Sequence, residues 1–153
     1  MRAFRRLYVI ALAVSMSLLT TAAAADCSAF PQDLIEKWGK EKQLVLNLSM
    51  AKGRNLKTMR ETIGAPDPAT FRTLADGFET SEFEGVERLG IFLAPEEIVE
   101  GLRQTADLLE AALATGGSPT DPAWQALSDF YTPQFFGKHN SAISYYLSEA
   151  GCA

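Results

Sequence analysis

The sequence predicts an all-α protein, a compact bundle of about six helices whose termini are joined by one disulfide. Two observations predict the helices: proline or an Asp-Pro pair recurs where a helix would begin, and apolar residues then follow at steps of three and four. A third observation predicts the disulfide, because the two cysteines, Cys27 and Cys152, lie near the two ends of the expected domain, residues 26–153.

The first 25 residues have the pattern of a secretory signal peptide. Arginines precede an uncharged apolar run at 7–19, and small residues fill positions 20–25. The apolar run is shorter than the roughly 20 residues that a membrane-spanning helix needs. We therefore expect residues 1–25 to be removed, and residues 26–153 to form a single helical domain in the periplasm or outside the cell, without a membrane anchor after cleavage.

Loss of the signal peptide makes the chain more acidic. The full sequence has 14 Lys+Arg and 19 Asp+Glu, and the signal peptide contains three of the basic residues and none of the acidic ones. The remaining domain has 11 basic against 19 acidic residues, a net charge of −8. Because such a surface repels phosphate groups and anionic lipid, we expect no nucleic-acid partner.

Cys27 and Cys152 allow only one pairing, and disulfides are typical of exported proteins. Closing so long a loop removes about 5 kcal/mol of unfolded-chain entropy in the loop model. A redox or metal-binding pair would need C-x-x-C spacing or additional ligands, which the sequence lacks. We therefore expect a structural bridge that brings the last helix, the aromatic C-terminal region and His139 close to the start of the first helix.

The first expected helix follows Pro31 and carries Leu34 and Trp38 on one face. Residues 44–50 can extend this helix, but they also alternate apolar and polar side chains as a strand does. A strand needs a partner, and residues 90–93 are the other candidate. We favour helix for both segments, with a two-stranded patch as the alternative.

Short helices are expected in the next part of the chain. Apolar residues keep helical spacing over 56–63, and again over 71–78 after an Asp67-Pro68 start, where Asp can cap the first amide groups. Ser81-x-x-Glu84 resembles a capping box, which predicts a further helix through residues 83–93.

The clearest helix begins at Pro95, has acids in its first turn, and is expected to stop at Gly116-Gly117. Another helix is expected after Asp121-Pro122, with an apolar face over 124–131. The last apolar face covers 143–147.

His139, the only histidine, is the first candidate for function. A catalytic histidine needs a nucleophile within hydrogen-bond reach and usually a carboxylate that orients it. Ser141 and Ser144 are near in sequence, and Asp129 or Glu149 could be near in space, but no nucleophile elbow or H-E-x-x-H pattern is present. We favour a place in a loop or helix cap, with ligand contact and catalysis as alternatives.

Aromatic residues are dense near the C-terminus, and the stretch comprises Trp124, Phe130, Tyr131, Phe135, Phe136, Tyr145 and Tyr146. Such residues fill a core, but they also line partner surfaces and small-molecule pockets. We favour core. A haem pocket is one alternative, although covalent attachment would need a C-x-x-C-H pattern, which is absent, and we expect no cofactor.

Two charged stretches complete the candidates. The basic run Lys52, Arg54, Lys57 and Arg60 contains no acid, so it could receive a carboxylate, a phosphate or an acidic protein surface. The acid-rich stretch at 76–87 lacks the ordered calcium loop, and we expect no metal site there. A solvated helix face is the simpler interpretation of both.

Together these patterns predict a small exported helical protein that binds a partner protein without enzymatic activity, as an inhibitor, an immunity-type factor or an accessory factor. The hypothesis rests on the absence of catalytic patterning and on two candidate contact surfaces, the Lys52–Arg60 run and the aromatic C-terminal region. The alternatives are a carrier of a small apolar or aromatic ligand such as haem, and a hydrolase or lyase that uses His139.

Overall fold

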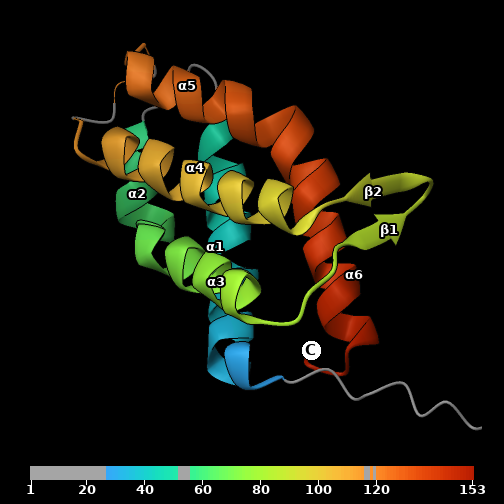
Figure 1. The fold of residues 1–153 in the computed structure, drawn as a ribbon. Helices are drawn as coiled ribbons and strands as arrows, with labels where there is room; N and C mark the ends of the chain where they lie inside the picture. The colour runs from blue at the N-terminus through green and yellow to red at the C-terminus, as the bar shows by residue number, and fades with distance from the viewer. Residues whose placement is uncertain (1–26, 52–55, 116–117, 119) are drawn as a thin grey trace, which may run out of the picture.

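The computed structural model describes residues 27–51, 56–115, 118 and 120–153. The predicted signal peptide at 1–25, the basic residues Lys52 and Arg54, and the predicted stop at Gly116-Gly117 lie outside the described residues. Within them the chain forms six α-helices, one β-hairpin, one 3-10 turn and one π-helix (Figure 1). The predicted all-α bundle of about six helices is therefore confirmed.

The elements are, in chain order, η1 (Cys27–Ala29), α1 (Gln32–Ser49), α2 (Leu56–Ile63), α3 (Pro68–Thr80), β1 (Val86–Arg88), β2 (Ile91–Leu93), α4 (Pro95–Leu113), α5 (Pro122–Phe130), η2 (Tyr131–Asn140) and α6 (Ser141–Glu149). The 3-10 turn is η1 and the π-helix is η2. Because α5, η2 and α6 follow one another without a break, they form one long helix whose middle is wider than its ends.

The helix starts predicted at Asp67-Pro68, Pro95 and Asp121-Pro122 are confirmed. The side chains of Asp67 and Asp121 each accept a hydrogen bond from the amide two residues on, at 3.0 and 2.9 Å. Proline follows each of them at the first helical position, where its missing N–H costs nothing. Pro95 likewise occupies the first position of α4, where the Glu97 carboxylate accepts a 3.0 Å hydrogen bond from the amide of Ala94. Local capping chemistry thus sets where these helices begin.

Residues 44–49 belong to α1, as preferred from the sequence. The expected helix over 83–93 is wrong: β1 and β2 pair antiparallel there, with Val86 opposite Leu93. That pair is seven residues apart, a spacing that fits one helix face as well as a hairpin. The connection decides, because Leu89 and Gly90 have φ values of 53° and 76°, the positive pair of a tight two-residue hairpin turn.

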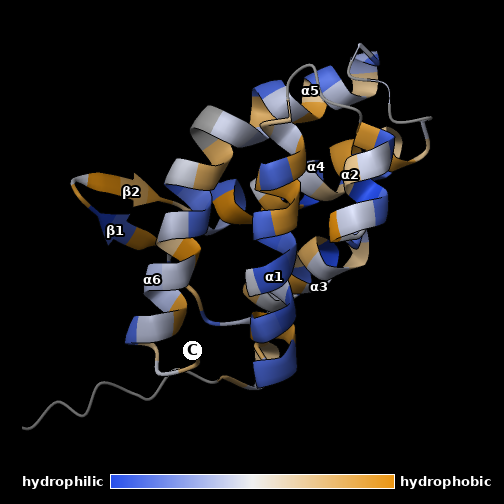
Figure 2. Cartoon of the chain, turned by 180° about the vertical axis from the view of Figure 1, so that it is seen from behind, coloured by the Kyte–Doolittle hydropathy of each residue, from blue (hydrophilic) through white to orange (hydrophobic). Residues whose placement is uncertain are grey.

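The helices pack around one continuous hydrophobic core. Helices α3, α4 and α5 lie side by side, and α1 crosses them from behind (Figures 1 and 2). On the surface between α3 and α4, Arg103 contacts Asp76 and Glu79, so part of the acid-rich stretch is ion-paired. Exposed pairs of this kind contribute little, and burial of apolar area supplies most of the stability. None of the described helices combines the length and apolar character that crossing a bilayer requires.

The predicted Cys27–Cys152 disulfide joins η1 to the residues after α6, with 5.4 Å between the two Cα atoms. Of the expected aromatic stretch, Tyr146 packs against Phe30, three residues after Cys27, with 6.2 Å between ring centroids. Phe30 also packs on Phe78 at 4.7 Å. His139 lies before α6, whose nine residues span roughly 13 Å. The bridge therefore does not bring His139 to the joined termini.

Candidate functional site

The β1–β2 hairpin projects from the helical body (Figures 1 and 2). It exposes apolar side chains. Leu89 is 91% exposed, Phe92 58% and Ile91 50%, and Tyr145 on the neighbouring α6 is 40% exposed. Figure 2 shows β2 as a hydrophobic strand beside the hydrophilic β1. Because gathered apolar side chains on a protein surface usually mark an interaction site, we take this hairpin surface as the candidate functional site.

Leu89 is unsuited to its position on two counts. Its side chain gains almost nothing from burial, and its backbone is left-handed with φ of 53°. That conformation costs a residue with a side chain about 1–2 kcal/mol, and Asn or Asp is the usual choice at the first position of such a turn. Neither packing nor backbone preference therefore accounts for leucine here.

The base of the hairpin is firmly held. Val86 and Leu93 are buried in the core, and the Nη1 group of Arg88 donates a hydrogen bond of 2.8 Å to the carbonyl oxygen of Ser141 on α6. Gly85 has φ of 109°, and a Cβ atom there would lie 2.5 Å from the ring of Phe92. These contacts fix the apolar tip in one place, so it is a preorganised surface.

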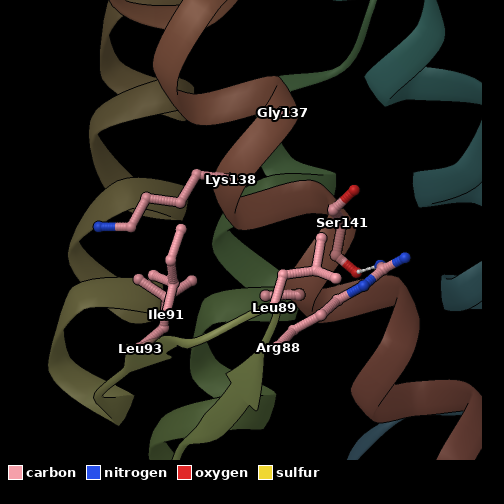
Figure 3. A pocket seen from close by; sticks show the side chains of 8 residues that line it. Arg88, Leu89, Ile91, Leu93, Gly137, Lys138 and Ser141 are labelled. Atoms are coloured by element: carbon pink, nitrogen blue, oxygen red, sulfur yellow. Dashed lines mark hydrogen bonds between the residues drawn. The ribbon is translucent and has the colours of Figure 1, made fainter.

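A slot runs between the hairpin and the junction of η2 with α6 (Figure 3). Its volume is about 410 Å³, including the solvent space at its mouth, and it is lined by Arg88, Leu89, Ile91, Leu93, Gly137, Lys138, Ser141 and Ala142. Side chains alternate along a strand, so Arg88, Ile91 and Leu93 face the slot while Phe92 lies on the opposite face. The slot is therefore an apolar trough between two cationic side chains.

Arg88 is held in place but not neutralised. Its guanidinium carbon lies 5.5 Å from the centre of the Tyr145 ring, and its hydrogen bond goes to an uncharged carbonyl. Within the part of the chain that the structure describes, Arg88 forms no ion pair, whereas Arg103 contacts two carboxylates. Lys138, on the other side of the slot, lies 3.9 Å from a carboxylate oxygen of Glu97. Arg88 is thus a fixed positive charge at the edge of an apolar slot.

The aromatic residues proposed from the sequence divide between core and surface. Trp124, Tyr131 and Phe135 are at most 3% exposed and belong to the hydrophobic core, and Phe136 is half-buried. None of them lines the slot or the second pocket described below. Tyr145 is the one member of the proposed set that lies at the hairpin surface.

The π-helix η2 owes its position to a buried polar network. The Tyr131 hydroxyl donates a 3.0 Å hydrogen bond to the carbonyl oxygen of Lys42 on α1, and accepts one of 3.1 Å from the amide of Asn140. Burial raises the pKa of Tyr131, so the hydroxyl keeps its proton for this bond. Pro133 has no N–H to donate, which favours the change from α to π hydrogen bonding at this point. The network ties both ends of η2 to α1.

His139 packs within the same region. Its ring is stacked on Phe135, with centroids 4.8 Å apart and an angle of 12° between the planes. Gly101 on α4 permits this arrangement, since a Cβ atom there would lie 2.6 Å from the Phe135 ring and 3.3 Å from His139. These contacts give His139 a packing role between η2 and α4.

Lys42 and Ser144 form a serine–lysine contact, with 2.9 Å between Nζ and Oγ. Such pairs act as base and nucleophile in some hydrolases, and burial lowers the pKa of Lys42. However, the ammonium group lies 4.0 Å from the centre of the Trp38 ring, which favours the charged form, and Ser144 lines neither surface pocket. We interpret the contact as a link between α1 and α6.

The basic run is described only in part. Lys57 and Arg60 on α2 line a second, open hollow together with Glu61, Ala65 and Thr115. Since Lys52 and Arg54 lie outside the described residues, a continuous basic face stays a prediction.

The hairpin surface was missed from the sequence, although a signal for it exists. Two triplets, Val-Glu-Arg and Ile-Phe-Leu, flank a two-residue gap that ends in Gly90, which is the spacing of a tight hairpin. Leucine at the first turn position conceals this signal.

Among the described residues, no group of three or more His, Cys, Asp or Glu could hold a metal ion. No protein-family model, curated protein or solved structure matches the chain, so function is inferred from the hairpin surface itself.

Proposed function

We propose that this protein is an exported, non-enzymatic factor that binds a partner protein, as an inhibitor, an immunity-type factor or an accessory factor, and that the β1–β2 hairpin is its docking surface. The N-terminal signal pattern and the Cys27–Cys152 bridge support export. The observation that carries the docking proposal is Leu89, a large apolar residue held in solvent at the tip of a strained turn.

A fixed apolar tip is an efficient way to bind a protein. Full burial of a Leu or Phe side chain in a partner's pocket is worth about 1.5–3 kcal/mol. Leu89 and Phe92 stand on a hairpin whose base is buried and hydrogen-bonded, so little conformational entropy is lost when they dock. Apolar anchors of this kind commonly supply most of the binding energy of an interface.

The test is affinity purification from a native periplasmic or secreted extract with matched variants. Leu89→Asn removes the apolar tip and suits the turn, so the fold should be preserved. Met50→Ser is the control, because Met50 is an apolar residue that is 61% exposed at the end of α1. We expect the wild type and Met50→Ser to recover the same stoichiometric partner, and Leu89→Asn to recover at least about tenfold less.

Equal recovery by Leu89→Asn would show that the hairpin is not the docking surface, and a purely monomeric wild-type eluate would count against the whole proposal. The structure adds no observation that favours the alternative functions. Most of the aromatic residues on which the carrier hypothesis depends belong to the core or pack against it, and His139 packs against Phe135 and Gly101.

A further inference from the structure

The residues that line the slot beside the hairpin indicate which kind of ligand it would bind. Its floor and one wall are apolar, formed by Ile91, Leu93 and Ala142. At its edge Arg88 presents a guanidinium group whose charge is not balanced by any carboxylate among the described residues. A ligand that fits both features has an apolar side chain and a carboxylate close to it.

We propose that the slot binds a peptide segment of the partner protein in which an apolar residue lies next to an acidic one, with the apolar side chain in the slot and the carboxylate on Arg88. This inference rests on the proposed docking function of the hairpin and names the chemistry of the partner's segment.

The geometry of Arg88 supports an anion receptor. One nitrogen is engaged by the Ser141 carbonyl and the guanidinium lies beside the Tyr145 ring, so the side chain is oriented before a ligand arrives. Arginine can then offer its remaining N–H groups to a carboxylate in a forked arrangement. Figure 3 shows the Arg88 guanidinium and the Lys138 ammonium directed to opposite sides, with Leu89 and Ile91 between them.

Charge complementarity favours an acidic segment at this one place. The domain has a net charge of −8, so an acidic peptide is repelled by most of its surface. Arg72, Arg103 and Lys37 are each paired with acids, whereas Arg88, like Lys40, Lys57 and Arg60, has no ion pair among the described residues. Of these four cations, Arg88 is the one that lines the slot. The combination of this charge with the adjoining apolar slot gives specificity, because a segment must present an apolar and an acidic side chain together to use both.

Space is available for the peptide backbone. Gly137 forms part of the slot wall, and a Cβ atom built there would have no heavy atom within 4 Å. The neighbouring Lys138 is only loosely paired, at 3.9 Å from Glu97, and can move aside. The wall opposite the hairpin is therefore open enough to admit an extended segment.

The test uses the purified, isotope-labelled domain and short peptides, so it does not depend on identification of the partner. The probe is acetyl-Leu-Glu-amide, compared with acetyl-Leu-Gln-amide, which lacks the charge, and acetyl-Ala-Glu-amide, which lacks the apolar side chain. Nuclear magnetic resonance titration should show shifts confined to residues 88–93 and 137–142, with a dissociation constant on the order of 1 mM. Each comparison peptide should bind about fivefold more weakly.

Variants of Arg88 separate charge from fold. Arg88→Gln should abolish the difference in affinity between the Glu and Gln peptides, but should leave the difference in affinity between the Leu and Ala peptides. Arg88→Lys should restore part of the preference for Glu over Gln. Lys40→Gln, at an exposed position of α1 (Figure 1), is the control and should change neither difference.

Equal affinity for the Glu and Gln peptides, or shifts outside the two segments, would overturn the proposal. Binding of octanoate with the same Arg88 dependence, without binding of the peptides, would assign the slot to a fatty acid and would also overturn it. The two proposals fail in different ways. If Leu89→Asn captures the partner as well as the wild type does, the proposed docking function is refuted. If Leu89→Asn loses the partner but Arg88→Gln still captures it, only the acidic-segment inference is refuted.

Discussion

Replacement of Leu89 by asparagine should make the protein more stable. The left-handed backbone at φ of 53° costs leucine about 1–2 kcal/mol, and asparagine tolerates this region at the first position of a two-residue turn. Since Leu89 is 91% exposed, removal of its side chain forfeits only about a tenth of the roughly 1.5–3 kcal/mol that a fully buried leucine contributes. The net expectation is a gain of about 0.5–1.5 kcal/mol in the free energy of unfolding.

Urea denaturation followed by tryptophan fluorescence measures this gain, because Trp38 and Trp124 are both buried and report on the core. The slope of the transition should be unchanged and the midpoint should rise. Leu89→Ala is the matched control: alanine also has a Cβ atom and keeps the strain, so its stability should stay close to that of the wild type. If Leu89→Asn were clearly less stable than the wild type, Leu89 would be a structural residue, and the main support for hairpin docking would be lost.

Three further substitutions test the stability of the fold, two at the core contacts that support the hairpin surface and one at the terminal disulfide. Tyr131→Phe removes the hydroxyl that donates to the Lys42 carbonyl oxygen and accepts from the buried Asn140 amide, and should cost about 1–3 kcal/mol in chemical denaturation. No loss of stability would mean that water replaces the hydroxyl. Gly101→Ala places a methyl group 2.6 Å from the Phe135 ring, which should cost about 1–3 kcal/mol of stability. This loss should exceed the roughly 1 kcal/mol that alanine gains in helix propensity. A variant more stable than the wild type would contradict the close contact. Cys27→Ser opens the terminal bridge and should lower the melting temperature, with a loss of about 2–5 kcal/mol, whereas identical melting curves with and without reductant would show that the bridge is incidental.

The parts of the fold that could be predicted are those set by local chemistry. An aspartate side chain that accepts from the amide two residues on, followed by proline, begins a helix wherever it occurs, so Asp67 and Asp121 mark real helix starts. The disulfide was predictable for a different reason, because two cysteines allow only one pairing. Neither prediction needed knowledge of which residues lie beside each other in space.

The hairpin could not be predicted in the same way, because its apolar residues satisfy two periodicities. Val86 and Leu93 would share a helix face, yet they pair across two strands. The choice depends on the Leu89-Gly90 turn, and leucine is a poor indicator of positive φ. When a functional residue opposes the usual backbone preference of its position, as Leu89 does, prediction from backbone preferences misses the element that it belongs to.

The aromatic C-terminal region still matters for the site, although most of it is buried. The wall of the slot is formed by Gly137, Lys138, Ser141 and Ala142, which lie where the π-helix η2 passes into α6. The position of η2 in turn depends on the Tyr131 bond to α1 and on the stack of Phe135 and His139 against Gly101. These core residues position the surface that the hairpin completes. Their substitution should therefore lower the stability of the fold, and should weaken peptide binding only as far as the slot wall shifts. By contrast, Leu89→Asn and Arg88→Gln should weaken binding directly, and Leu89→Asn should do so while it raises stability.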